Sequence, residues 1–337
     1  MAKVTLKTLA EETGLSKFAV SRALAGKSGV SEATRARVLE MADKLGYSNK
    51  TRQDLKPIGL VFDDTDVANS ELHLQLQSGI QREADRQGYP VRIQWTHSAE
   101  ELAVFAARCS GLLLVGPHRP DGLERAYATK VPIVRLGWVD PLEQVDRVSG
   151  TDHEAGVAVA DYLYGLGHRK FVYVLGTPAY RGRLERLHGL REGLEDRPGA
   201  SVVNLTWGAE GSFKQALQHH FPNGLDATAL FCSHDGLAVT VVSELLSAGY
   251  RIPEDVSVVG FGDHSPSRQI TPQLTTVRTP GQEIGIAAVR LVLEHLNGNH
   301  DVTFPIRIQI PCTLVERQSS GRCGASMAIG KRSPRRK

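Results

Sequence analysis

Residues 4–47 constrain the fold more than any other part of this 337-residue chain. Apolar residues recur there at helical spacing in three short segments, and each segment begins with a residue that can cap a helix: Thr5, Ser16 or Ser31. Gly14 follows the first segment and favours a tight turn. Two short helices joined by a glycine-containing turn form a helix-turn-helix, whose second helix is shaped to enter the major groove of DNA.

The second segment has two different faces when it is placed on a helix. Ala19, Val20, Ala23 and Leu24 share the face that we expect to be buried. The candidates for DNA contact are the caps and the polar or exposed residues near them: Thr5, Ser16, Lys17, Phe18, Ser21 and Arg22. Arg22 can pair with a guanine edge, whereas Phe18 can offer only apolar contact, for example to a thymine methyl group. In the third segment we expect Val38, Leu39, Ala42 and Leu45 to face inward.

The charge is distributed unevenly along the chain. The net charge is +3, but residues 1–56 carry +5 and residues 318–337 carry +6, which leaves −8 for the residues between them. A basic N-terminal segment on an acidic body directs the positive end toward nucleic acid. The tail is rich in Gly, Ser, Arg and Lys, and we expect it to be disordered; it either attracts phosphates weakly or is merely solvated.

From residue 58 onward, apolar runs typical of strands alternate with segments of helical periodicity. We expect a buried strand at 58–62 and further strands at 91–95, 111–115, 132–136, 171–175, 202–205, 229–232, 256–261 and 304–310. We expect helices between them at 71–87, 100–108, 121–129, 152–164, 183–194, 211–219, 237–246 and 282–296. This alternation indicates an α/β fold with parallel sheets covered by helices, in two similar halves that face each other across a cleft.

The N-terminal motifs resemble the headpiece of one family. Val4-Thr5-Leu6, Leu9-Ala10, Gly14-Leu15-Ser16, Val20-Ser21-Arg22 and Gly46-Tyr47 are similar to the LacI/GalR (lactose-repressor/galactose-repressor) family of bacterial transcription regulators, and the similarity continues to Arg317. The resemblance implies a helix-turn-helix headpiece at 1–47, a hinge at 48–56, a two-lobed effector-binding and dimerisation body at 57–317 and a basic tail at 318–337. It also implies a periplasmic-binding-protein architecture, in which the chain crosses between the lobes three times and residues 280–310 are split across a crossing.

The hinge departs from the family pattern. In this family the hinge helix orders on operator DNA and places a leucine in the minor groove, and the resemblance puts Asn49 and Leu55 at the DNA-contacting positions. The proline that usually precedes the hinge asparagine is missing, and so is the usual alanine-arginine pair. Leu55 is therefore either the minor-groove wedge or a residue that packs against the hinge of a partner chain.

Polar clusters follow six of the expected strands, where ligands bind in open α/β sheets. They lie at 62–66, 116–119, 137–140, 176–181, 233–235 and 262–264, and their aromatic, carboxylate and arginine side chains suit a polar, hydroxyl-bearing molecule. The loop after Phe62 includes Asp63, which is a candidate contact. The resemblance adds Arg186, Trp207, His234, Asp235 and Asp263 as effector-binding positions. His234 replaces the usual asparagine and Gly262 the usual first aspartate, so the effector is expected to differ from the familiar simple sugars.

The sequence lacks the motifs that are typical of enzymes and of metal-binding proteins. Ser233, His234 and Asp235 are neighbours in sequence and cannot form a catalytic relay, and the sequence has no nucleophile elbow, phosphate loop or zinc spacing. We therefore expect no enzyme, no cofactor and no metal. The four cysteines are scattered, and neither a signal peptide nor an apolar run of membrane-spanning length is present, so a cytoplasmic protein with reduced thiols is expected.

The function that these patterns favour is a DNA-binding regulator, most often a repressor in such families, controlled by a sugar or sugar-derived effector. A homodimer on a palindromic operator follows from the helix-turn-helix, and helix 71–87 is expected to supply much of the interface. The alternative is a solute-binding protein or carbohydrate-binding module without a regulatory role, which shares the two-lobed body but needs no helix-turn-helix.

Overall fold

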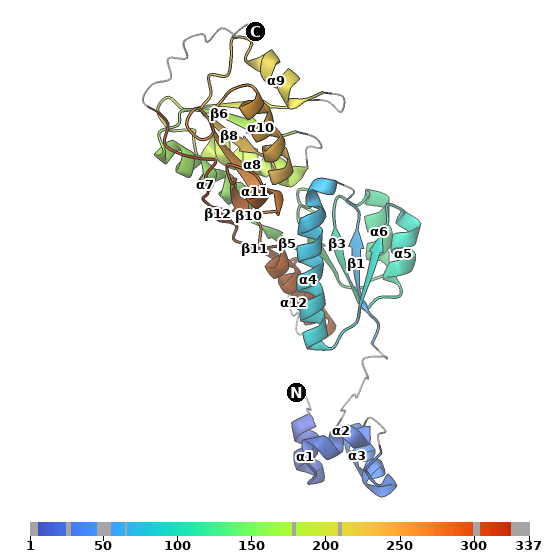
Figure 1. The fold of residues 1–337 in the computed structure, drawn as a ribbon. Helices are drawn as coiled ribbons and strands as arrows, with labels where there is room; N and C mark the ends of the chain where they lie inside the picture. The colour runs from blue at the N-terminus through green and yellow to red at the C-terminus, as the bar shows by residue number, and fades with distance from the viewer. Residues whose placement is uncertain are drawn as a thin grey trace. The chain divides into compact units, whose positions relative to one another are not determined.

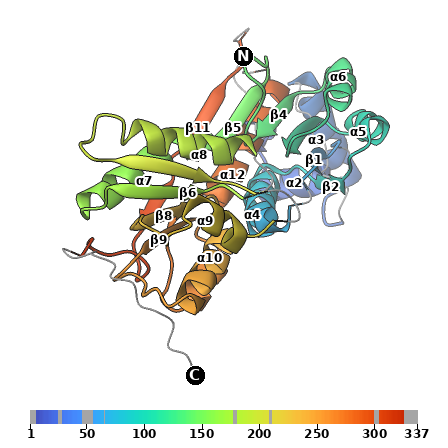
Figure 2. The same ribbon diagram turned by 90° about the horizontal axis from the view of Figure 1, so that it is seen from above.

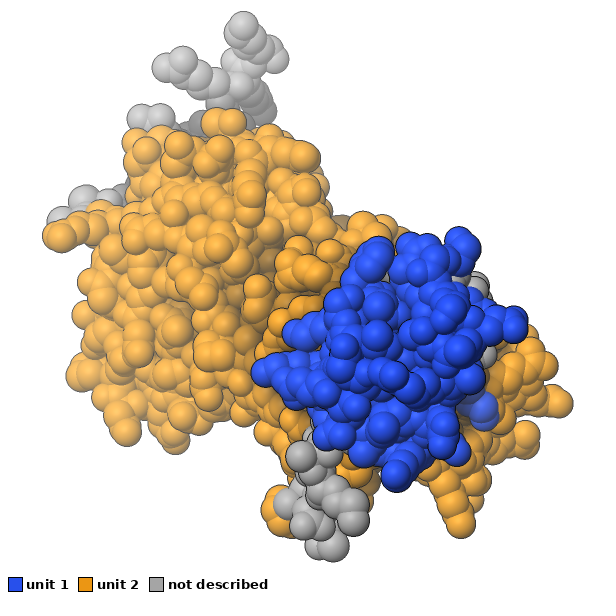
Figure 3. All heavy atoms as spheres, turned by 90° about the horizontal axis from the view of Figure 1, so that it is seen from below, with its two compact units in different colours: residues 1–57, 88–90 blue, residues 58–87, 91–337 orange. Residues whose placement is uncertain are grey.

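The computed structural model describes residues 6–24, 28–45, 55–64, 66–176, 180–207, 211–298 and 304–324. Thr5, Asn49 and residues 325–337 lie outside this part of the chain. The chain divides into two compact units, residues 1–57 with 88–90 and residues 58–87 with 91–337 (Figure 3). Within the described ranges, no helix is both long and apolar enough to cross a membrane.

The N-terminal unit contains three helices: α1 (Leu6–Thr13), α2 (Lys17–Leu24) and α3 (Glu32–Lys44). Gly14 adopts a φ of +67°, which makes the turn between α1 and α2. The hydroxyl of Ser16 accepts the Ala19 amide at 3.1 Å, and that of Ser31 accepts the Thr34 amide at 3.2 Å. The predicted turn and these two caps are confirmed.

The core of this unit is small and apolar. It contains Leu9, Ala10, Val20, Ala23, Val38 and Ala42. The inward position predicted for Leu39 is wrong, because its side chain is 49% exposed. Val38 and Ala42 are four residues apart and define the buried stripe of α3, and Leu39 is turned about 100° away from Val38 around the helix axis.

The second unit contains two lobes, each built on a six-stranded sheet (Figure 1). Lobe 1 has the strand order β11-β5-β4-β3-β1-β2, and all of its strand pairs are parallel. Its strands are β1 (Ile58–Phe62), β2 (Val91–Trp95), β3 (Gly111–Val115), β4 (Ile133–Leu136), β5 (Asp146–Gly150) and β11 (Arg307–Ile310). Its helices are the short η1 (Val67–Asn69), α4 (Ser70–Gln87), α5 (Ala99–Ala106), α6 (Pro120–Ala128) and α12 (Gly281–Leu296).

Two pairs of helices cover the faces of the lobe 1 sheet. Helices α5 and α6 pack on one face, and α4 and α12 lie side by side on the other (Figures 1 and 2). The α4–α12 contact is so close that a Cβ atom at Gly79 would lie 2.1 Å from the carbonyl oxygen of Gln282. Only glycine allows this approach of the two helices.

Lobe 2 repeats the arrangement with the order β12-β10-β9-β8-β6-β7, in which only β12 pairs antiparallel. Its strands are β6 (Lys170–Val174), β7 (Ser201–Leu205), β8 (Ala229–Cys232), β9 (Ser257–Gly262), β10 (Thr275–Arg278) and β12 (Thr313–Val315). Its helices are α7 (Asp152–Gly165), α8 (Arg181–Glu192), α9 (Phe213–His220), α10 (Asp235–Ser247) and α11 (Pro266–Gln269). Helices α7 and α8 cover one face of the sheet and α9 and α10 the other.

The chain passes between the lobes three times, after β5, after β10 and after β11. Helix α12 and strand β11 return to lobe 1, and β12 then ends in lobe 2. The predicted α/β fold and the three crossings are confirmed. The expectation that residues 280–310 are split across a crossing is wrong, because α12 and β11 both lie in lobe 1 and the crossings come before and after them.

The prediction that the tail is disordered from residue 318 is wrong for residues 318–324. Ser319 is fully buried, and its hydroxyl donates to the carbonyl of Val258 at 2.5 Å. His168 Nε2 lies 3.0 Å from the carbonyl oxygen of Gly321, and Ser320 bonds to the hydroxyl of Thr275 at 2.7 Å. Hydrogen bonds from serine hydroxyls join this polar segment to lobe 2. A prediction of disorder that is based on low hydrophobicity does not take such hydrogen bonds into account.

Candidate functional site

A cavity of about 210 Å³ lies between the two lobes, beyond the carboxyl ends of β1, β3 and β4. Leu72, Leu76 and Ile284 provide apolar walls. The polar lining comes from both lobes and includes Asp64, His73, Trp138, Tyr180, Arg183 and Arg186. This is the place where a parallel α/β sheet normally binds a ligand.

Asp64 is the most extensively hydrogen-bonded carboxylate of this cavity. It accepts a hydrogen bond from the side-chain amide of Asn69 at 2.6 Å, and His73 Nε2 lies 3.2 Å from the carboxylate. The hydroxyl of Tyr180 donates from lobe 2 at 3.0 Å. Burial alone would raise the pKa of Asp64, but these hydrogen bonds and one from the Asp66 amide outweigh it and lower the pKa to about 2. Asp64 is therefore an ionised acceptor at neutral pH.

Asp152, at the first crossing, holds a tryptophan and an arginine in place. Trp138 Nε1 donates to one carboxylate oxygen at 2.8 Å, and Arg186 Nε donates to the other at 2.8 Å. Arg186 also donates to the carbonyl of Ser233, and its guanidinium lies 3.4 Å from the centre of the Phe261 ring. The cavity thus has an indole ring and a guanidinium whose orientations are fixed by one carboxylate.

The lobes are joined directly across the cleft. Arg183 Nη2 donates to Asp66 at 2.6 Å, and the side chain of Arg183 is only 3% exposed. The carboxylate of Glu71, in the first turn of α4, accepts the backbone amide of Ser265 at 2.9 and 3.1 Å. Together with the Tyr180–Asp64 hydrogen bond, these contacts hold the cleft closed around the cavity.

Asp63, one of the predicted effector contacts, points away from the cavity. Its carboxylate contacts His97 Nδ1, and it lies 3.6 Å from His118 Nδ1. The next residue, Asp64, lines the cavity instead. Successive side chains at a strand end point to opposite sides, so a prediction that is off by one residue selects the wrong face. Asp64 is the better candidate.

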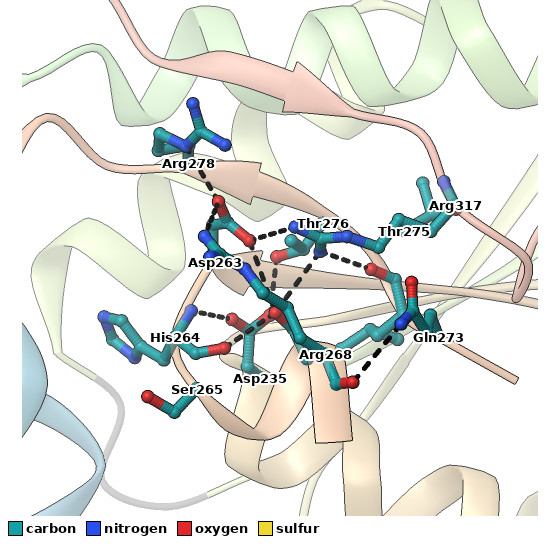
Figure 4. Close-up of polar contacts among 12 residues, drawn as sticks. Asp235, Asp263, His264, Ser265, Arg268, Gln273, Thr275, Thr276, Arg278 and Arg317 are labelled. Carbon is teal, nitrogen blue, oxygen red and sulfur yellow. Dashed lines mark hydrogen bonds and ion pairs between the residues drawn. The ribbon is translucent and has the colours of Figure 1, made fainter. Parts of the chain in front are cut away.

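Asp235 and Asp263 are used in internal contacts of lobe 2 (Figure 4). Asp235 is fully buried and accepts the Thr276 hydroxyl at 2.5 Å and the His264 amide at 2.7 Å. Burial raises the pKa of Asp235 despite these hydrogen bonds. The carboxylate of Asp263 binds three guanidinium groups, those of Arg268, Arg278 and Arg317.

The three arginines determine the ionisation of Asp263. Burial alone would raise the pKa of this carboxyl, but the arginine hydrogen bonds lower it to about 2. Neither Asp235 nor Asp263 lines the cavity, so both support the loops around the cleft rather than its surface. Contact of either residue with an effector stays a prediction.

The other two predicted effector residues of lobe 2 also have internal partners. His234 is the N-cap of α10, where its Nδ1 accepts the Leu237 amide at 3.1 Å. Burial, and then the nearby Arg183 guanidinium, lowers the pKa of His234 to about 3. Trp207 is half-buried and packs beside Phe213, with ring centres 6.4 Å apart. Of the predicted effector residues, only Arg186 lines the cavity.

Sequence reasoning missed several lining residues. Trp138, Tyr180 and Asp64 lie inside polar clusters that the sequence indicated, but they were not singled out. Asp152 and His73 gave no signal, since both lie at helical positions. The tryptophan after β4 was the available clue, because an aromatic residue at a strand end is a common ligand platform.

The N-terminal unit presents the predicted surface on α2. Lys17, Phe18 and Ser21 are exposed, and Phe18 is 71% exposed. Arg22 Nε donates to the carbonyl of Ser28 at 2.9 Å, and its guanidinium lies 5.4 Å from the centre of the Phe18 ring. Leu55 is half-buried, while Thr5 and Asn49 lie outside the described residues.

Comparisons with known proteins agree with this architecture. Residues 5–49 match the model of bacterial regulatory proteins of the lacI family, and residues 160–320 match a periplasmic binding protein-like domain. A transcriptional regulator named MalR from Streptomyces coelicolor is 30% identical over 317 residues, which cover 87% of this chain and 90% of MalR. The chain belongs to the LacI family. It is therefore a transcriptional regulator with a helix-turn-helix domain and an effector-binding body.

Other LacI-family proteins are similar over comparable lengths. The transcriptional repressor PurR of Aliivibrio salmonicida is 26% identical over 319 residues, which cover 88% of this chain and 93% of PurR. A solved structure of the regulator CelR in complex with cellobiose is 26% identical, with a TM-score of 0.69, and covers 94% of this chain and 100% of CelR. The similarity thus extends over both the helix-turn-helix and the two-lobed body.

Proposed function

We propose that this LacI-family regulator binds a palindromic operator as a homodimer, and that an uncharged, hydroxyl-bearing effector in the interlobe cavity controls its affinity for DNA. The observation that carries the proposal is the cavity itself, which both lobes line and which contains Asp64, Trp138 and Arg186. A ligand held by groups on both lobes favours one lobe arrangement over another, and this difference is the basis of a conformational switch.

The charges of the cavity favour a neutral ligand. Arg186 is paired with Asp152, Arg183 with Asp66 at 2.6 Å, and Arg181 with Glu185 at 2.7 Å. An anionic effector would have to compete with these carboxylates. The ionised Asp64 accepts hydrogen bonds, and hydroxyl groups donate them, while the Trp138 ring suits the apolar face of a sugar. The cellobiose bound to the similar CelR supports a carbohydrate.

The proposed DNA contacts lie at the start and along the outer face of α2. Ser16 caps this helix, and Lys17, Phe18, Ser21 and Arg22 are proposed to face the operator. We propose the same role for Thr5, Asn49 and Leu55, with residues 1–47 as headpiece, 48–56 as hinge and 57–317 as body. Two headpieces related by a two-fold axis would read two half-sites.

We propose that the chain has no catalytic role. The hydroxyl of Ser233 donates to the carbonyl of Leu175 at 2.7 Å, His234 caps α10, and Asp235 bonds to Thr276. These three neighbours have different partners, so they support the fold and do not form a relay. A solute-binding protein without a regulatory role would not account for the basic helix-turn-helix.

The first test is a thermal-shift screen of the full chain against neutral sugars, sugar acids and phosphorylated sugars. A neutral sugar that binds only the folded state raises the melting temperature. Calorimetry with that sugar should then show a loss of affinity in Asp64→Asn and Arg186→Ala. Asp63→Asn is the matched control, because the neighbouring carboxylate points away from the cavity. Normal binding by both cavity variants, or stabilisation by sugar acids alone, contradicts the proposed site.

The second test measures the link to DNA. Operator half-sites are selected from random DNA with the full chain, and binding is followed by fluorescence anisotropy with and without the sugar. The sugar should change operator affinity by the factor by which operator changes sugar affinity, about 5–150-fold for such couplings. A sugar that binds without any effect on DNA affinity would favour the solute-binding alternative.

A further inference from the structure

Strand β5 contains a buried arginine that lies directly behind one wall of the cavity. Arg147 is 6% exposed, and its guanidinium lies over the Trp138 ring, 4.8 Å from the ring centre. Trp138 lines the cavity between the lobes, whereas Arg147 does not. The guanidinium therefore lies on the side of the indole that faces away from the cavity.

The charge of Arg147 has no direct counter-ion in the described part of the chain. No acidic side chain there forms an ion pair with it, and its Nε has no hydrogen-bond partner. Asp152 and Glu185 attract the guanidinium from a longer distance, and both carboxylates are paired with other arginines. Burial, and then the nearby Arg307, lowers the pKa of Arg147. Arginine nevertheless stays protonated in proteins.

The Trp138 ring compensates part of the cost of this buried cation. A charge in the protein interior is unfavourable unless it has a partner. A cation over an indole is attracted by the negative face of the ring, and burial strengthens this attraction. The sheet itself works against the charge, because Arg135 and Arg307 lie at the same register as Arg147 on β4 and β11. The contact with Trp138 is therefore the feature that accounts for an arginine at this position.

The indole of Trp138 contacts both lobes. Its Nε1 donates to Asp152 at 2.8 Å, and a Cβ atom at Gly182 would lie 3.0 Å from the same nitrogen, so this edge of the ring touches lobe 2. The contact with Arg147 lies within lobe 1, since β5 and the loop after β4 both belong to that lobe. When the lobes separate, the contacts of the ring with Asp152 and Gly182 are lost and the contact with Arg147 remains.

We propose that Arg147 is a positioning residue for the effector, which holds the indole of Trp138 as a preformed wall of the cavity while the lobes are open. The inference rests on the proposed function, because it concerns the affinity of that same cavity for its ligand. A ring that is already fixed loses no rotational freedom when the ligand arrives, and this strengthens binding. An uncharged residue at position 147 leaves the ring free to turn in the open form.

The first experiment needs no ligand. The chain has three tryptophans, so Trp95→Phe together with Trp207→Phe leaves Trp138 as the only indole. Time-resolved fluorescence anisotropy of the full chain then measures the local motion of this ring. Arg147→Met keeps an unbranched side chain but removes the cation, and it should add a fast component of indole motion. Arg307→Met is the matched control, because it makes the same charge change at an exposed residue of the same register and should add no such component.

The second experiment is a double-mutant cycle measured by calorimetry with cellobiose, the sugar bound to the similar CelR. Arg147→Met should weaken binding about three- to thirtyfold, the range expected for the loss of a cation–π contact. In a Trp138→Leu background the same substitution should cause no further loss, because the ring through which Arg147 acts is absent. A role of Arg147 in folding alone would give equal losses in both backgrounds.

The outcomes separate this proposal from the proposed function. Unchanged indole motion in Arg147→Met, the same added motion in Arg307→Met, or equal losses of affinity with and without the Trp138 ring overturns the positioning role. Failure of wild type to bind cellobiose counts against the carbohydrate effector, and the anisotropy result then decides the role of Arg147 alone. Arg147→Gln, which places a neutral polar group in the buried site, replaces the methionine variant in both experiments if that variant does not fold.

Discussion

Replacing His234 with asparagine should make the protein less sensitive to acid. In the folded chain, burial and the Arg183 guanidinium lower the pKa of His234 to about 3, and the other ionisable side chains that influence it are Asp66, Arg186 and His264. In the unfolded chain the pKa of histidine is about 6.5. Between these values the unfolded state takes up a proton that the folded state does not. The free energy of unfolding therefore falls as the pH falls below about 6.5.

The size of this effect follows from the two pKa values. Between pH 7 and pH 5, one such site lowers the free energy of unfolding by about 2 kcal/mol, and the result changes little as long as the folded-state pKa lies below about 4. Asparagine caps a helix as well as histidine does, so the variant removes the proton uptake without removing the cap. Burial also lowers the pKa of His118 and His168. These two histidines add the same pH dependence of unfolding to wild type and to His234→Asn, so their effect cancels when the two proteins are compared.

The assay is urea unfolding followed by circular dichroism at pH 7 and pH 5. The proteins are wild type, His234→Asn and the control His219→Asn, whose side chain is exposed on α9. Wild type and control should lose about 2 kcal/mol more between the two pH values than His234→Asn does. Equal losses in all three proteins would refute the buried, neutral state of His234.

Three further predictions concern packing, DNA recognition and assembly. Gly79→Ala should lower the free energy of unfolding by about 1–3 kcal/mol, because its Cβ would meet the Gln282 carbonyl, whereas Gly165→Ala, in open space on α7, should be harmless in the same urea titration. Arg22→Ala should reduce discrimination between operator and random DNA by about 1–3 kcal/mol at matched salt, measured by anisotropy, and unchanged discrimination contradicts the assignment. Equilibrium sedimentation at micromolar concentration should show a dimer, and a monomer there would exclude the two-fold operator complex.

The order of elements was predictable because most of them have a strong periodic signal. Strand 229–232 was predicted with the observed ends, and so was the C-terminal end of α12 at Leu296. Strand β5 was missed because its buried positions include Asp146, Arg147 and Ser149, so no apolar run marks it. Strand β10 was missed for the same reason, since Thr275 and Thr276 are fully buried. Hydrogen-bonded polar side chains in a sheet interior give no hydrophobic pattern.

The candidate site was predictable only to the level of strand ends. The sequence indicated the loops after β1, β4 and β9, and the structure places a cavity beside the first two. It could not indicate that Asp64 faces the cavity and Asp63 does not, because one residue of register reverses the direction of a side chain. It also could not indicate that the Asp263 carboxylate forms ion pairs with three arginines, one of which, Arg317, is 54 residues away in sequence.

Strand β1 links the cavity to the segment proposed as the hinge. It starts at Ile58, two residues after the end of segment 48–56, and ends at Phe62, two residues before Asp64, so it spans about 17 Å. It pairs with β2 on one side and β3 on the other, and all five of its residues are buried. A strand held in this way does not slide within its sheet. An effector that acts on Asp64 must therefore move lobe 1 as a body, and the hinge would respond to the angle between the lobes.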